Sequence, residues 1–415
     1  MDSTVFICII AALATAGVII RPFRLPEAVW AVSGALFMLL FGLISWSDAW
    51  TGVMKGTDVY LFLIGMMMLA EAARQEGLFD WLASHATKVS GGSAVKLFIL
   101  IYIVGLVVTT FMSNDATAVV LTPAVAAAMQ SAKVKQPLPY LLICAFIANA
   151  ASFILPISNP ANLVIYGSHM PTLATWLSTY LLPSFFAVTI TFLMLLLTQR
   201  KYLREPIATD ISIQPLQKGG RIAMAGIILT SIILITVSAL NWELGLPTAI
   251  AGVGTALIVA IGARQNPLRL VRHISWAVLP LVAGLFVLVE ALNSTGLISS
   301  LSHVLADHAH RSPDTTAWVS GSALAFGSNL INNLPAGLIA GSTASAGHLP
   351  AIVRSCILIG VDLGPNLSVT GSLATILWLT ELRRHGHSIS AWQFLKIGSL
   401  VMIPALIAAF AALWI

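Results

Sequence analysis

Four short segments of the chain combine amide, hydroxyl and carboxyl side chains within otherwise apolar surroundings. They cover residues 111–117, 155–162, 327–335 and 360–372, and two of them contain an acid, Asp115 and Asp362. Prolines and glycines in the same segments interrupt helices, and the freed backbone N–H and C=O groups offer oriented dipoles to a ligand or ion. The segments therefore predict a binding site made of neutral polar groups. None of them contains Lys or Arg.

The composition shows where such a site must lie. The chain has 415 residues, of which 58% are hydrophobic and 9% charged, whereas soluble proteins carry about 25% charged residues. Apolar runs of nearly bilayer-spanning length recur along it, which excludes a soluble protein and a protein with a single anchor. The first run is followed by Arg21-Pro22-Phe23-Arg24 rather than a small-residue cleavage site, so we expect a retained span instead of a signal peptide.

The fold class predicted is an all-α polytopic membrane protein with about ten spans and two re-entrant hairpins. The two hairpins cover residues 94–130 and 315–346, and each returns to the side from which it entered; the predicted orientation is the same if either is a full pair of spans. The spans are expected at residues 4–20, 28–46, 58–73, 140–167, 176–198, 222–240, 247–263, 275–293, 351–380 and 390–414. With both termini outside, only Lys55, Arg311 and Arg354 of the 21 basic residues lie outside, as the positive-inside rule favours. This pattern predicts an inner-membrane protein with periplasmic termini, and the scattered basic residues argue against nucleic-acid binding.

An internal repeat is indicated around the polar linker 199–221. Residues 1–198 would form the first repeat, with broken helix 140–167, and residues 222–415 the second, with broken helix 351–380. Matched pairs across the linker are Glu71 with Glu290, Gly77 with Gly296, Asn114 with Asn332, and Cys144 with Cys356, at offsets of 219, 219, 218 and 212 residues. An odd number of crossings per repeat would invert the second copy, an arrangement that many carriers use.

Four acids lie within apolar stretches and need a physical reason. An acid at the bilayer centre costs roughly 2.5–3.5 kcal/mol, so its default role is functional. Glu71 and Glu290 are near the ends of their spans and are expected to reach the interface. Asp115 and Asp362 lie in the polar breaks and are the stronger candidates.

The cysteines and histidines give weaker evidence about a functional site than the acids do. Cys8, Cys144 and Cys356 lie in apolar stretches, where a free thiol usually packs as a small hydrophobe. A thiol is also a ligand for soft metalloid ions, and contact of Cys144 or Cys356 with a cargo of that kind is left open. The histidines form no metal-ligand spacing, so no metal and no cofactor are predicted.

The breaks, read in order, resemble those of the arsenite efflux permeases (ArsB) of the ion transporter superfamily. The resemblance runs along nearly the whole chain. It is carried by Ser113 to Pro123, Ser158 to Leu163, Asn332 to Ala336, and Asp362 to Asn366 leading to Gly371-Ser372-Leu373-Ala374-Thr375. The last segment is the most specific for arsenite permeases, whereas the Ser-Asn tips are shared across the superfamily.

The resemblance implies a scaffold domain, a transport domain that moves as an elevator, and export of arsenite and antimonite in exchange for protons. It also implies a homodimer and, in some members, a soluble arsenite-stimulated ATPase as partner. The expected proton-coupling residues are Asp115 and Asp362, and the expected substrate-binding residues are Asn114, Asp115, Thr117, Ser158, Asn159, Asn332, Asn333, Gly364, Asn366 and Thr370. One departure from the family is Asn149, which stands where some members carry Asp. If that Asp binds the proton in those members, Asp115 or Asp362 must bind it in this protein.

Arsenite near neutral pH is a small uncharged trihydroxide, which suits amide and hydroxyl groups. The nearest alternative is a sodium-coupled anion symporter or a sodium/proton antiporter on the same fold. An intramembrane enzyme is disfavoured because no spacing such as His-Glu-x-x-His appears. A channel would be distinguished by its inability to move cargo uphill.

Overall fold

The computed structural model describes residues 3–209, 215–263 and 267–415; residues 210–214 of the predicted linker lie outside this description. The described residues form helices and no strand, as the sequence predicted. The helices of the first half are α1 (Ser3–Ile20), α2 (Glu27–Leu40), α3 (Trp46–Lys55), α4 (Thr57–Gln75), α5 (Leu78–Val89), α6 (Ala94–Phe111), α7 (Asn114–Ala116), α8 (Thr122–Ser131), α9 (Leu138–Ala150), α10 (Pro160–Tyr166) and α11 (Leu173–Gln199).

The second half repeats this order of elements. Its helices are α12 (Lys218–Ala239), α13 (Gly245–Gly262), α14 (Pro267–His273), α15 (Val278–Ser294), α16 (Leu297–Arg311), α17 (Pro313–Ile331), α18 (Asn333–Ala346), α19 (Ala351–Leu363), α20 (Leu373–Arg384) and α21 (Ala391–Ala411). In both halves a long helix is followed by a sharp turn: Gly77 at φ 70° precedes α5, and Gly296 at φ 79° precedes α16. A left-handed backbone suits glycine, so the matched pair in the sequence marks the same turn twice.

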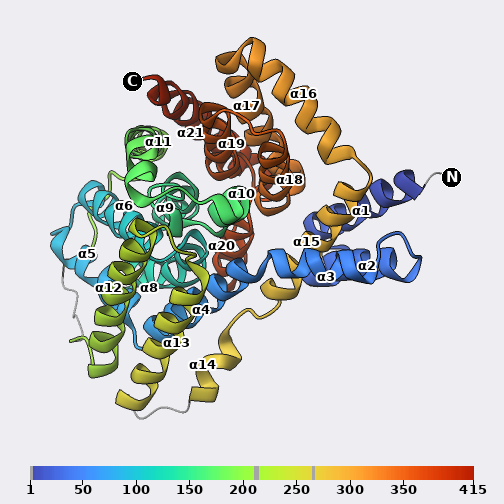
Figure 1. Cartoon of the computed structure of the whole chain (residues 1–415). Coiled ribbons are helices and arrows are strands. Elements are labelled where there is room, and N and C mark those ends of the chain that lie inside the picture. The colour runs from blue at the N-terminus through green and yellow to red at the C-terminus, as the bar shows by residue number, and fades with distance from the viewer. Residues whose placement is uncertain (1–2, 210–214, 264–266) are drawn as a thin grey trace.

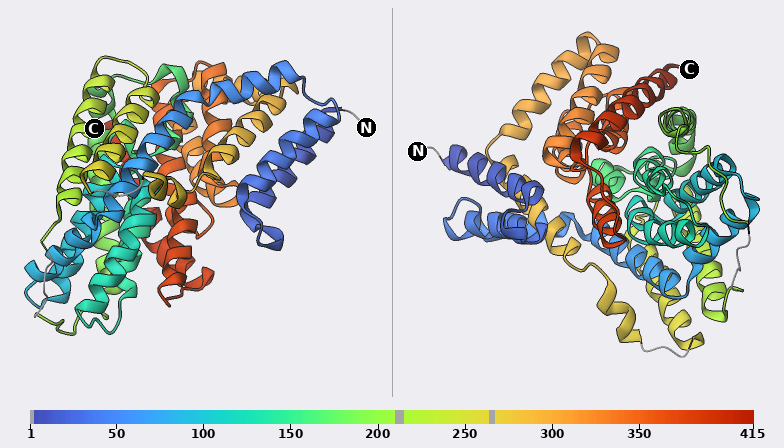
Figure 2. Two further views of the ribbon diagram at one scale, coloured as in Figure 1. Left: turned by 90° about the horizontal axis from the view of Figure 1, so that it is seen from below. Right: turned by 180° about the vertical axis from the view of Figure 1, so that it is seen from behind.

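Contacts between the halves are reciprocal. Helix α4 packs against α13, and its counterpart α15 packs against α2, the counterpart of α13. Helix α11 packs against its own counterpart, α21. In Figures 1 and 2, α1 and α2 lie beside α15 at one end of the molecule, while α5 and α12 lie at the other end. Each half therefore completes the packing of the other.

The lengths and compositions of the helices fit a membrane. Within the described residues, six helices are long and apolar enough to cross a bilayer: α1, α6, α11, α12, α13 and α21. Two bent pairs, α3 with α4 and α15 with α16, pass the same test when each pair is joined. Large apolar side chains such as Leu40, Ile261 and Leu330 point outward and are at least 74% exposed, which is the surface that lipid requires.

Small residues bring the α4–α13 pair into backbone contact. A Cβ atom placed on Gly65 would lie 2.1 Å from the Thr248 carbonyl oxygen, and one on Gly252 would lie 2.1 Å from the Gly65 carbonyl oxygen. Membrane helices associate through such close approaches because there is no hydrophobic driving force between helices in lipid, so van der Waals packing must supply the attraction.

Candidate functional site

All four polar segments of the sequence interrupt helices. Helix α6 ends at Phe111 before the short α7, α9 ends at Ala150 before α10, α17 ends at Ile331 before α18, and α19 ends at Leu363 before α20. Re-entrant insertion of the first and third of these segments remains a prediction.

The two broken helices are joined by a buried amide network. Asn149 Nδ2 in α9 donates to Asn366 Oδ1 at 3.0 Å, and Asn366 Nδ2 donates back to the Phe146 carbonyl oxygen at 3.0 Å. Ser372 Oγ donates to Asn149 Oδ1 at 3.1 Å, and Asn149 Nδ2 also approaches Thr375 Oγ1 at 3.2 Å. These side chains are almost wholly buried, so each must find its partner within the protein. The network fixes the two breaks relative to each other.

Asp362 belongs to the same region and has one bonded oxygen. Asn159 Nδ2 donates to Asp362 Oδ1 at 2.8 Å, while Asp362 Oδ2 is buried and has no hydrogen-bond partner. Asp362 is wholly buried and forms no ion pair with another described residue. A carboxyl group without a counter-charge in such a place is tolerated best as the neutral acid. Among the described residues, Asp362 is therefore not part of a structural ion pair.

The tip between α17 and α18 is fastened to the second break. Asn332 has φ 70°, accepts from the Leu334 N–H at the start of α18, and donates from Nδ2 to the Thr370 carbonyl oxygen at 3.4 Å. The N–H of Asn333 donates to the Gly371 carbonyl oxygen at 2.9 Å.

Asn329, one turn before this tip, strengthens the attachment. Asn329 Nδ2 donates to the Gly364 carbonyl oxygen at 3.0 Å. The Asn329 carbonyl oxygen accepts from Thr370 Oγ1 at 3.1 Å. The second tip and the second broken helix thus form one hydrogen-bonded unit.

The tip between α6 and α7 is organised by its own side chains. Ser113 Oγ accepts from the Ala116 N–H, and Asn114 Oδ1 accepts from the Asp115 N–H at 2.9 Å. Thr117 Oγ1 lies 2.8 Å from Thr109 Oγ1. Ser158, in the first break, donates to the Thr110 carbonyl oxygen at 3.0 Å, so the first tip is tied to the first broken helix.

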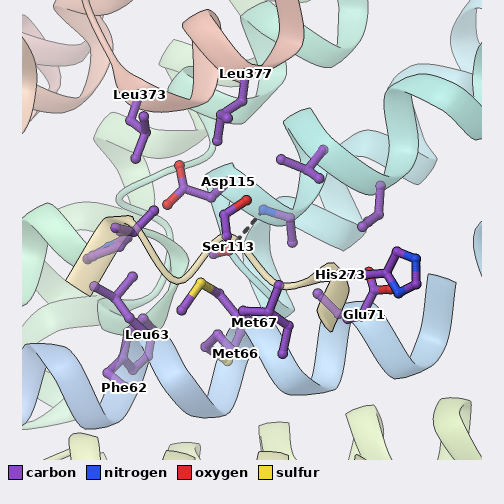
Figure 3. A pocket seen from close by; sticks show the side chains of 18 residues that line it. Phe62, Leu63, Met66, Met67, Glu71, Ser113, Asp115, His273, Leu373 and Leu377 are labelled. Atoms are coloured by element: carbon purple, nitrogen blue, oxygen red, sulfur yellow. Dashed lines mark hydrogen bonds between the residues drawn. The ribbon is translucent and has the colours of Figure 1, made fainter. Parts of the chain in front are cut away.

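A cavity of about 70 Å³ opens between this first tip and α4 (Figure 3). One side of the cavity is formed by Ser113 and Asp115. The other side is formed by Met66, Met67 and Glu71 of α4. The remaining wall comes from the starts of α10 and α20 and from the segment before α15; its residues include Pro160, Leu373, Leu377, His273, Ile274 and Ser275. A single water needs about 10–15 Å³ of such space, so the cavity has room for a small molecule. No described residue forms a hydrogen bond or ion pair with the Asp115 carboxylate.

The predicted site residues therefore fall into two groups. Asp115 alone lines this cavity. The other predicted residues do not line this cavity and lie in the hydrogen-bonded or close-packed parts of the breaks. They are Asn114, Thr117, Ser158, Asn159, Asn332, Asn333, Gly364, Asn366 and Thr370. None of the described cavities is lined by both tips; the amide network joins the two broken helices to each other instead.

The two outer acids, Glu71 and Glu290, are each paired with a basic side chain, and their position at the membrane interface remains a prediction. Arg74 donates to both oxygens of Glu71 at 2.6 and 2.8 Å, and Gln75 adds a third bond. Glu290 accepts from Lys55 Nζ at 2.6 Å. Each of these two carboxylates therefore has a basic side chain as its partner.

Residues that sequence reasoning missed are Ser372, Thr375, Asn329 and the cavity wall of α4. The signal for Ser372 and Thr375 was present, since both stand in the motif that resembles the arsenite permeases. Asn149 was considered only as the replacement of an acid, although a buried amide in an apolar helix requires a partner. The wall of α4 had no signal, because apolar residues face both lipid and protein.

Substitution of the buried thiols should leave transport unchanged. Cys144 and Cys356 are wholly buried and neither lines the cavity beside Asp115, and no group of three metal-binding side chains occurs among the described residues. We expect Cys144→Ala and Cys356→Ala to transport cargo at the wild-type rate, each with a modest loss of thermal stability from the removed sulfur. Uptake by membrane vesicles and melting of the purified protein measure the two effects. Loss of transport in a variant that melts normally would assign the thiol to the cargo.

Broken helices tied together at a buried acid, within a bundle of apolar helices, define a membrane transporter rather than an enzyme. The citrate transporter family model matches residues 9–358, so the chain belongs to that family of membrane transporters. It is similar over its length to the arsenical pump membrane proteins of Yersinia enterocolitica, at 29% identity over 92% of both chains, and of Escherichia coli K12, at 28% identity over 92% of both chains. A putative arsenical pump membrane protein of Bacillus subtilis is 26% identical over 92% of this chain and 93% of that protein.

Solved structures show the same architecture. The YdaH transporter of Alcanivorax borkumensis matches with a TM-score of 0.58 at 14% identity, covering 100% of this chain and 98% of that one. Neisseria gonorrhoeae MtrF, an antimetabolite efflux pump, matches with a TM-score of 0.51 at 12% identity, covering 100% and 94%. At these identities the likeness concerns the fold.

Proposed function

We propose that the protein exports arsenite and antimonite across the inner membrane in exchange for protons. The similarity to arsenical pump membrane proteins supports the cargo. The observation that carries the choice is the chemistry of the cavity: its lining offers Ser113, Asp115 and Ser275, but none of its lining residues is Lys or Arg. An uncharged trihydroxide needs hydrogen-bond donors and acceptors of this kind. Citrate would bring negative charges beside Asp115 with no cation to balance them.

Asp115 and Asp362 are the proposed proton carriers. Each lacks a counter-charge, and each lies at a break where small movements alter its surroundings. A carboxyl group that is neutral when enclosed and ionised when wetted releases its proton on opening. Proton entry could then be exchanged for cargo exit without any nucleophile or metal.

The proposed topology has support in how the loops gather. The segments at 132–136 and 202–207, both expected in the cytoplasm, line one cavity. The segments at 166–171 and 348–351, both expected outside, line another. Glu71 and His273, at cytoplasmic ends of their helices, border the Asp115 cavity, so we assign that cavity to the cytoplasmic side. Dimer formation, elevator motion and an ATPase partner remain predictions from the family resemblance.

The test is transport into inverted membrane vesicles with and without an imposed pH gradient. We expect arsenite to accumulate against its gradient when the vesicle interior is acidic, and to stop accumulating when an ionophore collapses the gradient. Vesicles lacking the protein are the control. Equilibration without accumulation would indicate a channel and would contradict the proposal.

The family model favours citrate as the alternative cargo, which the sodium-coupled anion symporter considered from the sequence would carry. The same vesicles distinguish it. Citrate uptake that requires sodium, with arsenite neither transported nor competing, would replace the proposed cargo. Arsenite uptake that is indifferent to sodium and to excess citrate would exclude the alternative.

A further inference from the structure

A second cavity lies on the face that the charge distribution assigns to the outside. It has a volume of about 360 Å³ and is enclosed by the end of α10, the start of α11, and the segment that joins α18 to α19. Its lining combines apolar surface with hydroxyl and basic side chains, which belong to Tyr166, His169, Thr175, Thr179, Tyr180, His348, Arg354 and Ser355. None of the described lining residues is Asp or Glu.

Arg354 is the cationic group in this cavity, and it has no carboxylate partner within the described chain. Its guanidinium carbon lies 5.6 Å from the centre of the Tyr166 ring, and Nη2 donates to the Ala344 carbonyl oxygen at 3.4 Å. The Nε atom is buried and has no hydrogen-bond partner. A guanidinium is always charged and carries five donors, so these contacts position it while leaving donors unused.

The other two basic residues predicted outside are accounted for. Lys55 pairs with Glu290, and Arg311 is exposed in the last turn of α16, where the helix dipole favours a cation. Arg354 differs because it is half-buried and uncompensated. A partly desolvated charge without a partner is costly, and this cost requires an explanation.

Hydroxyl groups and helix ends complete the surroundings. The Tyr166 and Tyr180 hydroxyls lie 2.6 Å apart, and the Tyr180 hydroxyl donates to Ser355 Oγ at 3.2 Å. The first turns of α11 and α19 both line this cavity, and the N-terminal turn of a helix carries partial positive charge. Each of these features favours negative charge.

We propose that this cavity binds a phosphate-type oxyanion, with Arg354 as its principal contact. The anion is either free inorganic phosphate or the phosphodiester of an anionic lipid headgroup, since both present the same oxygens to a guanidinium. The site is separate from the Asp115 cavity, and its occupation does not depend on which cargo the protein carries.

The experiment uses the full-length protein in nanodiscs of phosphatidylcholine. In one arm inorganic phosphate is added at constant ionic strength, and in the other phosphatidylglycerol replaces part of the lipid. Binding is read from the rise in melting temperature and from titration calorimetry. We expect one arm to stabilise the wild type, and Arg354→Gln to weaken binding about tenfold or more, the loss of a charge-assisted contact. Arg311→Gln is the matched control, because it removes a predicted outside arginine away from the cavity, and it should bind as the wild type does.

The arms also identify the anion. Stabilisation by phosphate alone indicates a free oxyanion, and stabilisation by phosphatidylglycerol alone indicates a lipid headgroup. If Arg354→Gln does not fold, Arg354→Lys retains the charge without the fork and should bind with intermediate affinity. The absence of binding in both arms, or equal binding by wild type and the Arg354 variants, would overturn the proposal.

Discussion

Replacing Asp362 by Asn should abolish proton-driven arsenite accumulation while the protein stays folded. The substitution preserves the shape of the side chain and the oxygen that accepts from Asn159 at 2.8 Å. It removes the group that gains and loses a proton, and the partnerless Oδ2 becomes an amide nitrogen. Accumulation in inverted vesicles under an acid-inside gradient should fall to the level of vesicles without the protein, and the melting temperature should change little.

Asp307→Asn is the matched control, because Asp307 is an exposed acid on α16, and its removal should leave accumulation unchanged. Asp115→Asn is expected to cause the same loss as Asp362→Asn, since its carboxyl lines the cavity. Normal accumulation by both Asp115→Asn and Asp362→Asn would refute the assignment of proton coupling to these acids.

The second large effect is expected at Gly364, which lies where the second break passes α17. A Cβ atom there would lie 2.3 Å from the Ala325 carbonyl oxygen and 2.5 Å from the Ala325 Cα atom. Backbone cannot rotate away as a flexible side chain can, so Gly364→Ala must separate α17 from the break. Overpacking of this kind costs about 1–3 kcal/mol or more, and the bonds from Asn329 to the Gly364 carbonyl would be lost with it. We expect a lower melting temperature and loss of transport.

Gly327→Ala provides the comparison, because Gly327 lies in α17, the helix that Gly364 packs against. A Cβ atom on Gly327 meets nothing within 4 Å, and alanine is favoured over glycine in a helix by up to about 1 kcal/mol. This variant should be as stable as the wild type or slightly more so. Equal melting temperatures for the two alanine variants would show that the contact at Gly364 is not tight.

Interruptions of helices were well predicted because proline, glycine and asparagine have local causes. Asn332 adopts a left-handed backbone and caps α18, and the Pro160 ring begins α10; both effects are legible in a few residues of sequence. The turn glycines Gly77 and Gly296 were likewise found by their matched spacing.

Partnerships across the chain could not be read in the same way. Asn149 and Asn366 are 217 residues apart, and the sequence names each as polar without naming the other. Nor could the sequence tell that most predicted ligand residues are hydrogen-bonded to other parts of the protein while Asp115 lines a cavity. Hydrophobic patterning cannot distinguish a cavity wall from a lipid-facing surface, so Met66 and Met67 gave no signal.

The backbone contact between Gly65 and Gly252 has a consequence for how cargo leaves. Helix α4 supplies one wall of the Asp115 cavity and is locked to α13 of the other half through atoms that no rotamer change can displace. We therefore expect that wall to keep its position relative to α13 during transport. Exit of a trapped molecule is therefore expected to come from retreat of the opposite wall, the first tip together with the starts of α10 and α20, and a cross-link confined to α4 and α13 should leave the rate of turnover intact.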